Sequence, residues 1–137
     1  MRNLGVADAV VTGRDYVGAL VGNNEGRVGA SWASGRVTGR DDVVGGLVGQ
    51  NEGVIAASYT SAGVTATGGG GSEITGGLVG WNRDTGSILA SYATGAVSGN
   101  REVGGLVGSN ERGGITASYS TGAVSGSGLN VGGLVGQ

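Results

Sequence analysis

A five-residue glycine-rich box recurs along the chain at a nearly constant interval. It reads Gly-Gly-Leu-Val-Gly from residues 45, 76, 104 and 132, and Gly-Ala-Leu-Val-Gly from residue 18. Successive copies begin 27, 31, 28 and 28 residues apart. Self-similarity at such a period is typical of stacked supersecondary units, each of which contacts only its neighbours. The chain must therefore fold as a series of similar layers.

The box divides the 137 residues into a single repeat array. We expect neighbouring repeats of a longer parent chain to flank this array, with any targeting signal outside these residues. The predicted units are a partial repeat at 1–17, full repeats at 18–44, 45–75, 76–103 and 104–131, and the start of a further repeat at 132–137.

Each repeat contains a polar turn after the box, and asparagine always occupies the second position after the box. Asparagine followed by glycine suits a bend with left-handed backbone angles, and stacked asparagines can form a hydrogen-bonded ladder. The four residues of this column are Asn24, Asn51, Asn82 and Asn110.

Three short strands are predicted in each repeat. The first follows the polar turn, as in residues 54–60, the second surrounds a valine such as Val97, and the third is the box itself with its leucine inward. Side chains in a strand alternate between two faces. Because the aromatic residues alternate in step with Ile55, Ile88 and Ile115, we expect Trp32, Tyr59, Tyr92 and Tyr119 to point inward and to stack on one another.

The same alternation places a column of serines on the opposite face of the first strand. Rows of small hydroxyls can bind glycans or, as a less favoured alternative, ice; a solvated sheet face is also simply polar. The candidate contact surface consists of Ser31, Ser58, Ser91 and Ser118.

These features predict an all-β fold, a parallel β-solenoid (β-helix) of about four coils with three short strands each. The alternative is a β-sandwich or a roll of hairpins. The solenoid is favoured because a unit repeated with its aromatics in one register makes columns of like residues, and no long segment has helical periodicity.

Composition excludes several classes of function. There is no histidine and no cysteine, so histidine zinc sites, Ser-His-Asp triads, disulfides and cysteine nucleophiles are absent. The eight basic residues are scattered arginines, which disfavours nucleic acid as a partner. No window approaches the roughly 20 apolar residues of a membrane helix, so no membrane insertion is expected.

The box, together with Ser-Tyr-Ala-Thr-Gly at 91–95 and Val-Ser-Gly at 97–99, resembles the GLUG-motif repeats. Such repeats occur in bacterial surface proteins, namely large adhesins, haemagglutinin-like proteins and IgA-specific metallopeptidases. The resemblance implies a non-catalytic structural or adhesive segment, extracellular or on the bacterial cell surface. Such a segment would act as a spacer and contact a host protein or glycan; a purely mechanical stalk is another possibility.

Carboxylate chemistry gives an alternative function of another class, a carbohydrate-active β-helix that uses Asp41 and Asp42. Glycoside cleavage needs two carboxyl groups converging on one bond, whereas adjacent strand residues point to opposite faces. We therefore expect no catalytic residue and no cofactor. The turn acids Glu25, Glu52 and Glu111 are the calcium candidates, but Arg83-Asp84 interrupts their column, so no metal is expected either.

Overall fold

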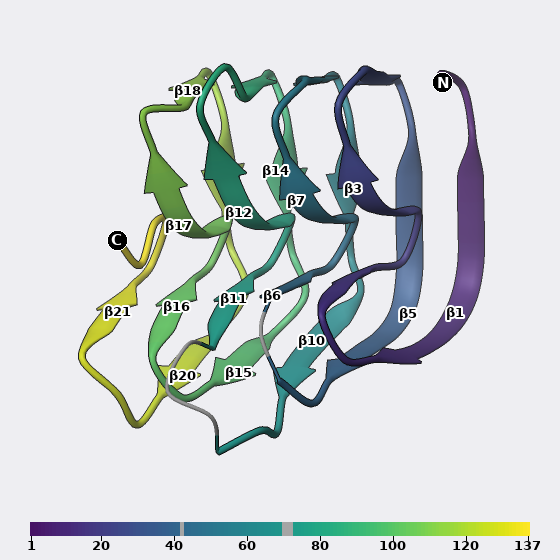
Figure 1. The fold of residues 1–137 in the computed structure, drawn as a ribbon. Helices are drawn as coiled ribbons and strands as arrows, with labels where there is room; N and C mark the ends of the chain where they lie inside the picture. Colours follow the sequence, from purple (N-terminus) through teal and green to yellow (C-terminus); the bar gives the residue numbers. More distant parts are fainter. Residues whose placement is uncertain (42, 70–72) are drawn as a thin grey trace.

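The protein is a parallel β-solenoid of about five turns, as predicted in class. A computed structural model describes residues 1–41, 43–69 and 73–137. Successive coils lie side by side, and the two termini lie at opposite ends of the stack (Figure 1). Four parallel sheets form its walls, and the described residues contain no helix.

Each sheet collects equivalent strands from successive coils. The β2–β21 sheet contains β2 (Tyr16–Gly18), β6 (Val43–Gly45), β11 (Ile74–Gly76), β16 (Glu102–Gly104) and β21 (Asn130–Gly132). The β3–β17 sheet contains β3 (Val21–Asn24), β7 (Val48–Asn51), β12 (Val79–Arg83) and β17 (Val107–Glu111). The β4–β18 sheet contains β4 (Arg27–Gly29), β8 (Val54–Ala56), β13 (Ser87–Leu89) and β18 (Gly114–Thr116).

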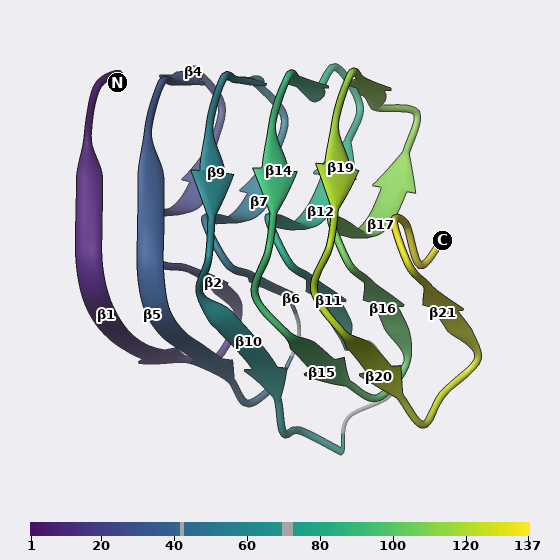
Figure 2. The same ribbon diagram turned by 180° about the vertical axis from the view of Figure 1, so that it is seen from behind.

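The fourth wall, the β1–β20 sheet, has eight strands, because most coils contribute two short strands to it. Figure 2 shows this wall from outside. Its members are β1 (Gly5–Gly13), β5 (Trp32–Gly39), β9 (Tyr59–Thr60), β10 (Gly63–Ala66), β14 (Tyr92–Ala93), β15 (Val97–Gly99), β19 (Tyr119–Ser120) and β20 (Val124–Gly126).

The coil therefore has more strands than the three predicted, because two of the predicted strands are bent. The segment 54–60 is divided at Ala57, whose backbone has a φ of 50°. This left-handed conformation is uncommon for a residue with a side chain. The bend recurs at Ala30, Ala90 and Ala117, and it turns the chain from the β4–β18 sheet into the β1–β20 sheet.

The box also forms a corner rather than a strand. In the second repeat, β6 ends at Gly45 and β7 begins at Val48. The backbone of the next coil passes so close that a Cβ on Gly46 would fall on the carbonyl oxygen of Gly77. Glycine is required here because no side chain fits between the two coils.

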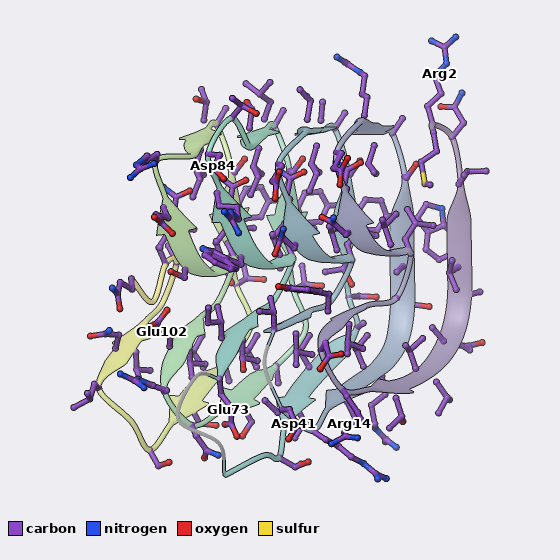
Figure 3. The ribbon with its side chains drawn as sticks, viewed as in Figure 1. Arg2, Arg14, Asp41, Glu73, Asp84 and Glu102 are labelled. Atoms are coloured by element: carbon purple, nitrogen blue, oxygen red, sulfur yellow. The ribbon has the colours of Figure 1, made fainter. Side chains whose placement is uncertain are left out.

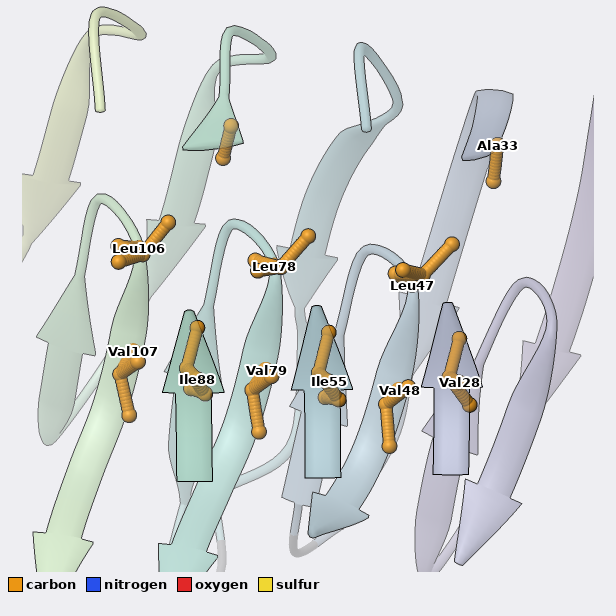
Figure 4. Packing of buried hydrophobic residues seen from close by; sticks show 11 residues of the cluster. Val28, Ala33, Leu47, Val48, Ile55, Leu78, Val79, Ile88, Leu106 and Val107 are labelled. Atoms are coloured by element: carbon orange, nitrogen blue, oxygen red, sulfur yellow. The ribbon is translucent and has the colours of Figure 1, made fainter. Parts of the chain in front are cut away.

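The corner directs both apolar residues of the box into the core. Leu47, Leu78 and Leu106 are fully buried, which confirms the predicted inward leucine, and the valine after each leucine is fully buried too. The leucines form one row across the coils, beside rows of valines and isoleucines (Figure 4). The core is thus made of parallel columns of like residues.

The predicted asparagine ladder is confirmed. The Nδ2 atoms of Asn24, Asn51 and Asn82 donate to the Oδ1 atom of the next asparagine at 2.7, 2.8 and 2.7 Å, ending at Asn110. Each amide also donates to a carbonyl oxygen of its own turn, such as that of Gly53 at 3.1 Å. The predicted left-handed bend is absent at these residues, because they lie in the extended strands β3, β7, β12 and β17.

Replacement of Asn51 by alanine tests how much this ladder contributes to stability. Asn51 is fully buried, and its loss removes the short hydrogen bond of the Asn24 amide and leaves the Oδ1 atom of Asn82 without a partner. We expect Asn51→Ala to lower the free energy of unfolding by about 2–4 kcal/mol in chemical denaturation. The control is Asn23→Ala, at an exposed neighbouring position, which should change it by less than about 0.5 kcal/mol. Equal effects of the two substitutions would contradict a structural role for the ladder.

Candidate functional site

The serine column predicted as the contact surface is buried. Ser31, Ser58 and Ser91 are each 1% exposed, so the outward assignment is wrong for these three, while Ser118 in the last coil is partly exposed. The left-handed alanine before each serine shifts the alternation by one residue and turns the serine inward.

These serine hydroxyls form a second ladder. The backbone N–H groups of Ser31, Ser58 and Ser91 donate to the Oγ atom of the serine in the next coil at 3.1–3.2 Å. Each Oγ donates in turn to the carbonyl oxygen two residues earlier in its own coil. The serines thus satisfy backbone groups at a corner and present no surface to a ligand.

The same shift brings the aromatic column to the outside. Trp32, Tyr59 and Tyr92 are partly exposed and Tyr119 is 52% exposed, so their predicted inward placement is wrong. Their predicted stacking is confirmed, with ring centroids 6.2, 4.9 and 5.0 Å apart in nearly parallel planes. Desolvation within the stack, and then the neighbouring Tyr119 and Tyr59, raise the pKa of Tyr92.

A row of hydroxyls runs beside this aromatic column on the outer face of the β1–β20 sheet. Its members pair in direct register from coil to coil, about 4.8 Å apart; Thr38 and Thr65 are partly buried, and the other three are exposed. These residues recur at the repeat interval in the sequence. Which hydroxyls face outward could not be predicted, because the left-handed bend at Ala57 and its equivalents was not expected. The row consists of Thr12, Thr38, Thr65, Ser98 and Ser125.

Charged residues gather in the loops before the β2–β21 sheet (Figure 3). Arg14 and Asp41, on successive coils, form an ion pair of 3.1 Å with exposed side chains of 79% and 42%. Such an exposed pair contributes at most about 1 kcal/mol. Asp42, the second residue of the predicted carboxylate pair, lies outside the described residues.

Glu73 is the unexpected residue of this region. It is 1% exposed, and neither carboxylate oxygen has a hydrogen-bond partner. Desolvation by burial raises the pKa of Glu73, the nearby Asn100 amide opposes the rise, and the charge of Asp41 adds to it. Glu73 and Asn100 line a cavity of about 380 Å³ together with Arg101 and Leu129. Its position just before β11 was visible in the sequence, but its burial was not.

Two of the three turn acids are engaged by polar neighbours. Glu25 accepts a hydrogen bond from Asn23, and Glu52 accepts one from Gln50 at 2.7 Å. Arg83 contacts both Glu52 and Asp84 and stacks over the ring of Trp81 at 4.5 Å. Among residues 1–41, 43–69 and 73–137, no three His, Cys, Asp or Glu side chains are grouped to hold a metal ion.

Together, the four walls and the residue columns define a repeat protein of the parallel β-solenoid class. The family model described as the GLUG motif matches residues 99–125, so the chain carries a GLUG motif there. The matched segment spans one coil, from the end of β15 into β20. No match was found among curated proteins or among solved structures. No helix in the described part of the chain is long and apolar enough to cross a membrane.

Stability should depend on pH through Glu73. Because its pKa is raised from the ordinary 4.5, the folded state retains the proton to higher pH than the unfolded chain does. Protonated Glu73 therefore makes its full contribution to the free energy of unfolding at pH values below the pKa that it has in the unfolded chain. This contribution is lost as the pH rises through the higher pKa that Glu73 has in the folded state. We expect Glu73→Gln to remove this decline and to raise the midpoint of thermal unfolding at pH 7.

The control for that experiment is Glu111→Gln, which neutralises an exposed acid. It should leave the pH dependence of the wild-type protein in place. A Glu73→Gln protein that loses stability with pH as steeply as the wild type would contradict the assignment.

Proposed function

We propose that this solenoid is a non-catalytic spacer in a bacterial cell-surface or secreted protein, and that one of its walls contacts a host protein or glycan. The observation that carries the proposal is the outer face of the β1–β20 sheet. That face runs through every coil and places the aromatic column beside the hydroxyl row. The resemblance to GLUG repeats of surface proteins supports the proposed location.

The geometry of this wall favours an extended ligand over a small one. Parallel strands repeat the same group about every 4.8 Å, so a polymer lying along the stack meets a hydroxyl at each coil. The tyrosine rings stack face to face, and so they offer mainly edges and hydroxyl groups to a partner. A polar polymer, such as a glycan chain or an extended peptide, fits these features.

The columns also suit the spacer role. Buried ladders and a continuous core link each coil to the next, so the stack resists bending between coils. Solenoids of this kind lengthen by one strand spacing per repeat. In a parent chain, the number of repeats would thus set the distance between the parts on either side of the solenoid.

A binding screen with two matched variants tests the contact role. The protein is applied to a glycan array and to host extracellular-matrix proteins. The double variant Thr94→Lys with Ser98→Lys places two charges on the outer face of the β1–β20 sheet, where both positions are exposed. We expect this variant to lose at least tenfold in affinity for any ligand that the wild type binds.

The control carries the same charges on another wall, as Ser87→Lys with Leu89→Lys in β13, and should bind as the wild type does. Absence of binding to every glycan and matrix protein would contradict the contact role and favour a purely mechanical stalk. Release of reducing ends from a polysaccharide, lost on Asp42→Asn, would instead favour the carbohydrate-active alternative.

A further inference from the structure

The loops before β11, β16 and β21 line a cavity of about 380 Å³ between successive coils. Such a volume lies at the lower end of the range of small-molecule sites, about 300–1,000 Å³. Of the described residues that line the cavity, none belongs to the aromatic column or to the hydroxyl row. The cavity is therefore separate from the outer face that we propose for contact with a partner.

Hydrogen bonds between the three loops fix the shape of this cavity. The Nδ2 atom of Asn100 donates to the carbonyl oxygen of Gly68 at 2.6 Å, and its Oδ1 atom accepts a hydrogen bond from the Ser127 hydroxyl at 3.1 Å. Beside them, the backbone N–H of Glu102 donates to the carbonyl oxygen of Glu73 at 3.1 Å. A ligand would thus meet a lining that the stacked coils already hold in place.

Glu73 brings a buried carboxyl group to this cavity, just before β11 (Figure 3). The residue is only 1% exposed, and within residues 1–41, 43–69 and 73–137 neither Oε1 nor Oε2 has a hydrogen-bond partner. The nearby Asn100 amide is already engaged by the carbonyl oxygen of Gly68. Buried polar groups are nearly always paired, so a carboxyl group left in this state at a cavity indicates that a bound molecule completes its hydrogen bonds.

Arg101 contributes hydrogen-bond donors to the same cavity. Because β11 and β16 pair in register from Ile74 and Glu102, Arg101 occupies the position of Glu73 one coil further on. No ion pair joins the two side chains in the described chain. The cavity therefore offers carboxyl oxygens as acceptors and guanidinium N–H groups as donors.

These two groups favour a neutral ligand that both donates and accepts hydrogen bonds. The guanidinium of Arg101 repels a cation, and the charge of ionised Glu73 repels an anion. Calcium takes six to eight oxygen ligands, and no three His, Cys, Asp or Glu side chains are grouped for a metal in the part of the chain that the structure describes. Desolvation by burial raises the pKa of Glu73, which further favours a neutral partner over an ammonium group. The hydroxyl groups of a sugar donate and accept at once, as this lining requires.

We propose that this cavity binds one neutral sugar unit of a glycan. The Glu73 carboxyl group hydrogen-bonds to the sugar hydroxyl groups, and the Arg101 guanidinium donates to sugar oxygen atoms. The sugar thereby supplies the partners that Glu73 lacks among the described residues. Glu73 acts here as a binding residue and not as a catalytic one.

Titration of the ¹⁵N-labelled protein with monosaccharides tests the proposal. The probes are the methyl glycosides of glucose, galactose, mannose and N-acetylglucosamine, with the free amino acid glycine as a zwitterion and calcium chloride as a cation. We expect at least one sugar to shift the side-chain signals of Asn100 and Arg101 in a saturable manner, whereas glycine and calcium leave them unchanged.

Two variants connect such binding to the cavity. Glu73→Met should weaken the affinity for that sugar at least tenfold and should keep the fold, because an apolar side chain of similar length replaces an unpaired buried carboxyl group. Arg101→Met, at an exposed position, should weaken it at least fivefold. The matched control is Glu102→Met, in the same loop region but not in the lining, which should bind within twofold of the wild type. Thermal unfolding of each variant checks that it is folded.

The absence of saturable shifts with every sugar would overturn the proposal. Wild-type affinity in both Glu73→Met and Arg101→Met would overturn the assignment of the site to this cavity. Saturable shifts with glycine or calcium, and none with the sugars, would overturn the assignment of the ligand as a neutral sugar.

Discussion

The stack depends on a column of buried asparagine amides, each of which hydrogen-bonds to the identical amide in the next coil. Asn51 and Asn82 are inaccessible to water, and each joins its neighbours on both sides through one Oδ1 and one Nδ2 atom. An unpaired buried amide costs about 1–3 kcal/mol. Each coil must therefore present its asparagine at the same height and angle as the coil before it.

Variation in repeat length is consistent with that constraint. The carbonyl oxygen that each asparagine amide contacts lies two residues on in the first two turns, four in the third and three in the fourth. The distances between asparagines nevertheless stay at 2.7–2.8 Å. The extra residues of the third and fourth turns therefore lie between the asparagine and the carbonyl oxygen that its amide contacts. In the longest repeat, residues 45–75, most of the added length lies elsewhere, in the loop before β11.

The repeat pattern was enough to predict the fold class, the asparagine ladder, the inward leucine and the stacking of the aromatics. Each of these follows from equivalent residues of successive repeats lying next to one another. The direction of the serines and aromatics was not predictable by alternation. Ala57 and its equivalents adopt a left-handed backbone that nothing in alanine itself favours. The bend turns the chain from one sheet into the next, and it exchanges the inward and outward faces of the serine and the aromatic residue that follow.

That reversal relocates the candidate site from one side of the strand to the other. The buried serines hydrogen-bond to backbone groups at a corner of the coil. The outer wall presents the rings of Tyr59 and Tyr92 beside the hydroxyl groups of Thr65 and Ser98. The burial of Glu73 was equally hidden, since it depends on how loops from adjacent coils cover one another. The surface that we propose for contact with a partner is accordingly the outer wall.

Hydrogen exchange of the asparagine side chains tests the central claim most directly. In ¹⁵N-labelled protein, the carboxamide protons of Asn51 and Asn82 should exchange only on global unfolding, as slowly as the backbone amides of the core strands. The exposed carboxamide of Asn23 provides an internal reference for fast exchange. Exchange of Asn51 and Asn82 at the rate of Asn23 would contradict the account, because it would mean that the amide ladder does not hold the coils in register.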